Sequence, residues 1–172
     1  PVSPSTLNSG LTTAYIQHWS FHVQRQAGNA TTVSVGYVGS AGAHLIRSRD
    51  LNQARPGPGD LAARRPHPEY SGIIYIEGSG NSNYHSLQAS VDRRFSRRFS
   101  LLAAYTWSKS IDDTSAFLST KPDKNFPQDS QNFHAERAVS SYDIPHRATA
   151  SFVVALPLKL EFGGITVLQG GQ

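Results

Sequence analysis

The chain has 172 residues, of which 38% are hydrophobic and 16% charged, and its formal net charge is +4. The charged share lies below the roughly 25% of an ordinary soluble domain, while the apolar share argues against general disorder. Because the chain has no cysteine, disulfides, zinc–thiolate sites and thiol nucleophiles are excluded. It also lacks methionine, even at position 1, so we expect it to be part of a longer protein or a processed form.

Six segments show the two-residue alternation of apolar and polar side chains that is typical of β-strands. In the first, Tyr15, Trp19, Phe21 and Val23 share one parity. The expected strands cover approximately residues 13–26, 32–37, 83–95, 99–108, 146–156 and 161–169. No segment favours a helix, and the apolar runs are far shorter than the ~20 residues of a membrane helix. The sequence therefore predicts an all-β, antiparallel up-and-down meander.

The connections between these segments alternate in length. Short turns are expected at about 27–30, 96–98 and 157–160, and long loops at about 40–82 and 110–145. Outer-membrane β-barrels have this layout, with short periplasmic turns and long extracellular loops. Six strands are too few to close such a barrel, so we interpret residues 1–172 as one partial barrel domain, a section of transmembrane wall.

The alternation also sorts the side chains into two faces. One face is apolar, and we expect it to contact lipid. The predicted lipid-facing residues are Trp19, Phe21, Val23, Val33, Val35, Leu101, Ala103, Phe152 and Val154. Aromatic residues lie at both ends of this band, as in barrel girdles. The predicted girdle residues are Tyr15, Tyr37, Tyr105 and Trp107 at the outer level and Phe95, Phe99 and Phe162 at the opposite rim. The other face is polar and is expected to line the lumen or contact a plug.

Other chemistries find little support in the residue pattern. His18 and His22 share one strand parity, but we interpret them as polar lumen-facing residues because further metal ligands would be needed. Asp112, Asp113, Asp123 and Asp129 leave calcium binding by a loop open, although their spacing does not match an EF-hand. We expect no enzyme activity, catalytic residue, metal site, cofactor or nucleic-acid partner.

Several longer runs resemble a known family of membrane receptors. They include YIQHWSFHVQRQ, TVSVGYVGSAGAHL, NYHSLQASVDRRFSRRFSLLAAYTWSKSIDD and FPQDSQNFHAERAVSSYDIPHRATASFVVALP. These runs are similar to the barrel of Oar-like TonB-dependent outer-membrane receptors, which are carboxypeptidase-regulatory-like-domain proteins of Gram-negative bacteria. The resemblance implies a barrel of about 22 strands, a size class whose interior is plugged. It also implies substrate import driven by TonB.

The expected function is therefore to build the wall and the extracellular ligand-contacting loops of such a transporter. The expected partners are outer-membrane lipid, the plug domain, the remaining barrel strands and TonB. The sequence does not identify the substrate or the residues that bind it. The alternative is a secreted β-sandwich or adhesin-type interaction module, because soluble sheets show the same alternation.

Overall fold

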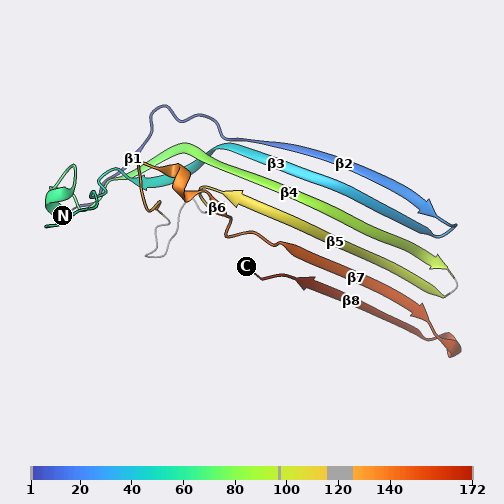
Figure 1. Cartoon of the computed structure of the whole chain (residues 1–172). Coiled ribbons are helices and arrows are strands. Elements are labelled where there is room, and N and C mark those ends of the chain that lie inside the picture. Colours follow the sequence, from blue (N-terminus) through green and yellow to red (C-terminus); the bar gives the residue numbers. More distant parts are fainter. Residues whose placement is uncertain (1, 97, 116–125, 172) are drawn as a thin grey trace. The chain divides into compact units, whose positions relative to one another are not determined.

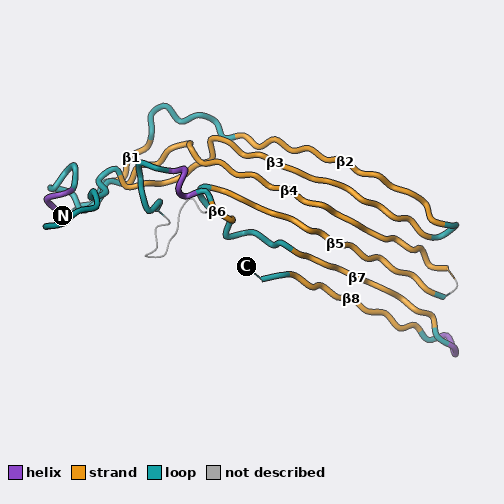
Figure 2. Tube along the Cα trace, in the orientation of Figure 1, coloured by secondary structure: helices purple, strands orange, loops and turns teal. Residues whose placement is uncertain are grey.

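The computed structural model describes residues 2–96, 98–115 and 126–171. These residues form strands and short 3-10 helices (Figures 1 and 2). The strands are β1 (Ser5–Leu7), β2 (Tyr15–Ala27), β3 (Thr31–Asp50), β4 (Ile74–Ser96), β5 (Phe99–Asp112), β6 (Ala138–Val139), β7 (His146–Ala155) and β8 (Glu161–Gln169). The 3-10 helices are η1 (Ala62–Arg64), η2 (Phe133–Glu136) and η3 (Pro157–Lys159). No described helix is long and apolar enough to cross a membrane.

The strands form one sheet in the order β2-β3-β4-β5-β7-β8, with β2 and β8 at its two ends. Consecutive long strands run in opposite directions, as the arrows in Figure 1 show. The expected all-β meander of six strands is thus confirmed. Two short strands were not expected: β1 pairs in parallel with β4, and β6 pairs antiparallel with β5.

The chain divides into two compact units. The first unit consists of Pro1–Gln17, Ala41–Ser82 and Ile111–Ser140, and the second of His18–Ser40, Asn83–Ser110 and Ser141–Gln172. The second unit contains the alternating parts of the long strands and their short turns. The first contains the polar strand ends, β1, β6, η1 and η2.

A short turn joins β2 to β3. β2 ends at Ala27 and β3 begins at Thr31, with Gly28 at a φ of +74°. A glycine adopts this left-handed conformation without the steric cost that other residues carry. The other two turns likewise lie between Ser96 and Phe99 and between Ala155 and Glu161.

The expected limits of the two long loops were wrong. β3 continues to Asp50, β4 begins at Ile74 and β5 continues to Asp112, so much of the segments 40–82 and 110–145 is strand. The sequences of these extensions hide the strands because their apolar residues are adjacent rather than alternating with polar ones, as in AGAHLIRSRD and IYIEGSGNSN. Backbone pairing needs no apolar alternation when neither face lies against an apolar layer.

No hydrophobic side chain among the described residues is buried. Apart from Pro127, the buried side chains are polar or charged, and most of these belong to the first unit. A soluble sandwich of this size would bury the apolar inner faces of two sheets. The described residues form a single sheet instead, which argues against the sandwich alternative.

Candidate functional site

An apolar face on the second unit is the first candidate for a functional surface. The register pairs Leu101 with Phe152 and Ala103 with Ala150. Directly paired residues of neighbouring strands project to the same side of a sheet. The predicted lipid-facing residues of β5 and β7 therefore share one face, on which Phe152 and Phe162 also contact each other with ring centroids 5.8 Å apart.

The contacts between β2 and β3 distinguish the same two faces. A Cβ atom at Gly39 would lie 2.4 Å from Trp19 Nε1, and one at Gly36 would lie 1.9 Å from His22 Nδ1. Trp19 thus packs over β3 on one face and His22 on the other. This agrees with the two parities of the sequence.

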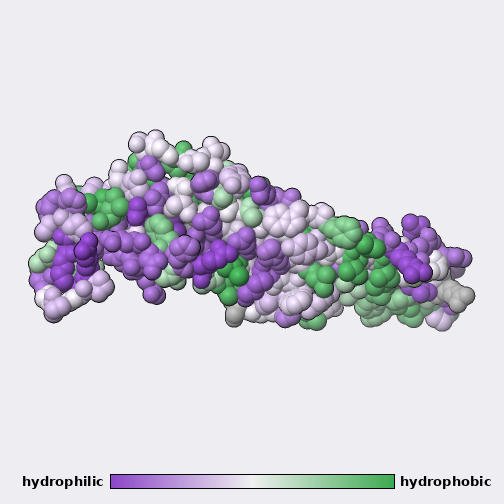
Figure 3. Space-filling model, turned by 45° about the horizontal axis from the view of Figure 1, so that its top comes forward, coloured by the Kyte–Doolittle hydropathy of each residue, from purple (hydrophilic) through white to green (hydrophobic). Residues whose placement is uncertain are grey.

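None of the sixteen residues predicted to face lipid or form the girdles is buried. Phe21 is 69% exposed, Val23 is 56% exposed and Trp107 is 57% exposed. Figure 3 shows hydrophobic side chains gathered toward the turn end of the strands. Apolar surface left in water costs about 25 cal/mol for each Å². Such a face requires an apolar environment, and lipid contact remains our prediction for it.

Aromatic side chains on this face form hydrogen-bonded pairs with histidines. The hydroxyl of Tyr37 lies 2.6 Å from His85 Nδ1, and that of Tyr105 lies 2.8 Å from His146 Nδ1. Both pairs have nearly parallel rings, at 21° and 20°. The phenol and imidazole groups satisfy each other's polar atoms, which suits a boundary between water and an apolar phase.

The spacing of the aromatic residues matches the height of a barrel's apolar band. Phe99 pairs with Val154, and Trp107 pairs with His146, eight residues farther along β5. At a rise of about 3.4 Å per residue these positions are roughly 27 Å apart along the strand. A strand tilt of about 40° reduces this to about 21 Å, close to the apolar band of about 25 Å in outer-membrane barrels. Tyr15 belongs to the first unit, where its ring contacts His44.

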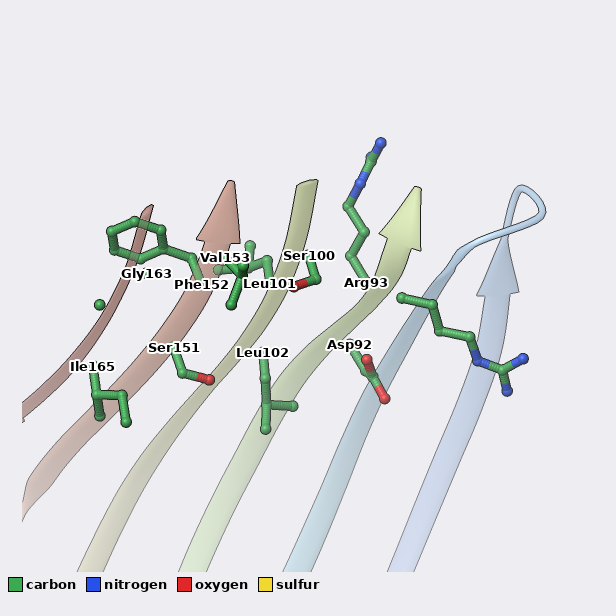
Figure 4. A pocket seen from close by; sticks show the side chains of 12 residues that line it. Asp92, Arg93, Ser100, Leu101, Leu102, Ser151, Phe152, Val153, Gly163 and Ile165 are labelled. Carbon is green, nitrogen blue, oxygen red and sulfur yellow. The ribbon is translucent and has the colours of Figure 1, made fainter. Parts of the chain in front are cut away.

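The opposite face of the second unit is less uniformly polar than expected. Ser34 Oγ lies 3.1 Å from Ser90 Oγ on this face. Near the turns, however, Leu102, Val153 and Ile165 line an open hollow of about 730 Å³ on adjacent strands (Figure 4). Sequence parity alone does not reveal this apolar patch, because the aromatic residues of the other face dominate the alternation. The strand register places Leu102 opposite Ser151 and Ser151 opposite Ile165, and so brings Leu102 and Ile165 onto the same face.

A cluster of charged residues forms the interior of the first unit. The Arg47 side chain is 2% exposed, and its Nη1 lies 3.6 Å from Asp113 Oδ1. Its Nη2 donates a hydrogen bond to the Asp113 carbonyl, and its guanidinium lies 3.8 Å from the Phe133 ring centroid. Asp113 in turn accepts hydrogen bonds from the backbone and side chain of Asn81. The cluster joins β3, β4, the end of β5 and η2.

A second arginine, Arg49, joins β3 to β4 and to the segment that contains Ser130. Arg49 Nε lies 3.1 Å from Glu77 Oε1, and Arg49 Nη1 donates to the Ser130 carbonyl over 3.0 Å. Gln53 accepts a hydrogen bond from the Ser130 backbone N–H. The first unit is thus a fixed polar assembly rather than a set of independent loops.

One loop of the first unit is held closed at its base by Asn52, which is fully buried. The Asn52 side-chain amide donates to the carbonyls of His67 and Tyr70, and its Oδ1 accepts from the His67 N–H. The segment 53–66 between them contains Pro56, Gly57, Pro58 and Gly59. A compact loop with its ends held together is a frequent functional element.

An ion pair in the second unit joins Lys109 of β5 to Asp143, which lies just before β7. Asp143 is 4% exposed and accepts hydrogen bonds from Lys109 Nζ at 3.0 Å and from the Ser110 N–H at 2.7 Å. Burial alone would raise the pKa of Asp143, but the Ser110 N–H and the Lys109 ammonium together lower this pKa below its usual value. Asp143 is therefore held as a carboxylate.

The residues considered for metal binding do not come together among those described. Asp112 accepts a hydrogen bond from Ser115, Asp129 accepts one from the Gln131 N–H, and Asp113 is paired with Arg47. Asp123 lies outside the described residues. No group of three or more potential metal-ligating side chains converges in residues 2–96, 98–115 and 126–171.

Comparison with known proteins identifies the family. A family model described as an outer membrane beta barrel domain matches residues 1–168. Comparisons with curated proteins and with solved structures find no match. The match covers nearly the whole chain and agrees with the meander, its short turns and its exposed apolar face. The chain therefore belongs to the outer-membrane β-barrel domain family, and its location is the outer membrane.

Proposed function

We propose that this chain forms part of the barrel of an Oar-like TonB-dependent importer. In this proposal the second unit is a section of transmembrane wall, and the first unit contacts the substrate outside the cell. The quoted sequence runs support the receptor type, and the family match supports the barrel itself. The plug domain, the remaining strands and TonB are the proposed partners, and the role is transport rather than catalysis.

The organisation of the first unit is the observation that carries the proposal. Its interior is charged, with Arg47 and Glu77 both less than 10% exposed. Loops that serve only as connections do not require buried ion pairs, whose desolvation is costly. Such an interior supports a preformed platform that presents the Asn52-closed segment 53–66 to a ligand. Binding residues on loops held by a rigid scaffold are common.

The proposed orientation can be tested in cells, because the chain has no native cysteine. Asp60 lies in segment 53–66 and Asn29 lies in the β2–β3 turn, and both are exposed. In the intact protein, Asp60→Cys should react with a membrane-impermeant maleimide on whole cells. Asn29→Cys should react only after the outer membrane is broken. The reverse pattern would contradict the orientation.

Import is tested by removing the tip of the same segment. The Arg55 N–H lies 3.4 Å from the Arg64 carbonyl, so deleting residues 56–63 joins positions that are already close. The deletion should leave barrel assembly intact, because loop shortening is tolerated at such sites. Cells should then lose accumulation of solutes from isotope-labelled culture filtrate, as should cells lacking TonB. If neither the deletion nor the loss of TonB changes this accumulation, the proposed import function is refuted.

A further inference from the structure

The turn between β7 and β8 differs in chemistry from the other two short turns. Residues 156–160 read Leu-Pro-Leu-Lys-Leu, whereas the β2–β3 turn is Gly-Asn-Ala and the β4–β5 turn is Arg-Arg. Leu158 at the tip is 90% exposed. A water-facing turn is normally built from polar residues, glycine or proline. The composition of this turn therefore requires a separate explanation.

The backbone of this turn is unfavourable for the residues that occupy it. Leu158 has a φ of +64° and Lys159 a φ of +62°. Two successive positive φ angles favour asparagine and glycine, as in a type I′ hairpin turn. A bulky residue in this region is a strained outlier. Leu158 thus combines backbone strain with an exposed apolar side chain, and neither is offset by burial within the described chain.

The apolar face of the second unit continues into this turn. The Leu156 N–H donates to the Leu160 carbonyl over 2.7 Å and closes the hairpin. Leu156 follows Val154 by two positions, and Leu160 precedes Phe162 by two, so both continue the apolar parity. The apolar stripe therefore passes the predicted Phe162 girdle and reaches the tip.

Positive charges accompany the apolar tip at the turn end of the second unit. Arg93, Arg94, Arg98 and Lys159 outnumber Asp92 and Glu161 among the described residues there. The Arg93 guanidinium lies 5.8 Å from the Phe99 ring centroid. Apolar tips with flanking cations fit a lipid surface, where side-chain stems lie among acyl chains and the cations meet phosphates.

We propose that the β7–β8 turn inserts into the headgroup region of the nearer membrane leaflet and binds anionic phospholipid. The Leu158 side chain reaches the acyl chains just beneath the headgroups, and Lys159 contacts the phosphates. The proposal rests on the outer-membrane location of the family and is independent of import. Transfer of Leu158 into lipid offsets the cost of its conformation.

A label at the tip measures its depth directly. The intact protein with Leu158→Cys or Asn29→Cys carries a fluorophore and is placed in phosphatidylcholine–phosphatidylglycerol vesicles. Brominated acyl chains should quench the label at position 158 at least about threefold more than the label at position 29, and aqueous iodide should show the opposite preference. Stronger iodide quenching at position 158 would overturn the proposal. Protection from both quenchers would also overturn it, because the tip would then lie against protein.

Two further variants test the role of each side chain. Leu158→Asn relieves the unfavourable backbone conformation, so it should stabilise a turn that lies in water. In the proposed lipid setting it should instead lower the urea concentration needed for unfolding from vesicles, and an unchanged or raised concentration would overturn the proposal. In the labelled Leu158→Cys protein, Lys159→Glu should reduce lipid quenching only when phosphatidylglycerol is present. An equal effect in pure phosphatidylcholine would contradict anionic lipid binding.

Discussion

The indole ring of Trp19 occupies the space above Gly39, where any β-carbon would lie 2.4 Å from Trp19 Nε1. Trp19 also contacts His85 on the next strand, with ring centroids 6.3 Å apart. The missing side chain of Gly39 therefore lets an aromatic residue of β2 lie flat across β3. This contact fixes the outer end of the apolar face on one edge of the sheet.

Gly39→Val should displace the Trp19 ring and lower the free energy of unfolding by about 1–3 kcal/mol through overpacking. The matched control is Gly171→Val, because nothing lies within 4 Å of a Cβ at Gly171. In a Trp107→Phe background, Trp19 emission reports the displacement, since the chain has two tryptophans. Unchanged emission and stability in Gly39→Val would contradict the contact.

Asn52→Ala should release the base of segment 53–66. Three hydrogen bonds of about 1 kcal/mol each are lost, two to the carbonyls of His67 and Tyr70 and one from the His67 N–H. Arg55, Arg64 and Arg65 lie in this segment, so cleavage by an arginine-specific protease should accelerate about tenfold or more. Asp60→Ala, an exposed change in the same segment, should leave the cleavage rate nearly unchanged.

Arg47→Ala should destabilise the first unit by about 3 kcal/mol, because the Asp113 carboxylate, which is only 10% exposed, would lose its cation. Hydrogen exchange measures this locally: the Asp113 N–H, which donates to the Asn81 carbonyl, should exchange faster. The exposed Arg55→Ala variant changes the same net charge and should not alter this amide. Equal protection in both variants would show that the Arg47 ion pair does not hold the unit together.

Asp143→Asn should reduce stability at neutral pH by about 2 kcal/mol, since charge-assisted hydrogen bonds from Lys109 and Ser110 are weakened. The lowered pKa of Asp143 sets the pH dependence. The stabilisation is complete above the ordinary aspartate pKa of about 4 and disappears as the pH falls through the lowered value. The difference in melting temperature from the wild type should therefore vanish in strong acid. A difference that persists there would exclude this ionisation as its source.

The strands and turns of the second unit were predictable because one face is apolar. The alternation around Val33 and Val35, and the glycine at position 28, are local signals. The polar extension of β3 to Asp50 has no such signal. Nor could the pairing of Arg47 with Asp113 be foreseen, because these residues are 66 positions apart. Interactions set by register and tertiary pairing become visible only once the strands are aligned.

The central claim is that the apolar parity of the second unit faces lipid. Ala103 and Ala104 test it, because they are adjacent on β5, both half-buried, and on opposite faces. Unfolding of the intact protein from lipid vesicles should show that Ala103→Arg costs about 2–4 kcal/mol, while Ala104→Arg costs about 1 kcal/mol or less. Equal costs for the two variants, or a larger cost for Ala104→Arg, would contradict the assignment of this face to the membrane.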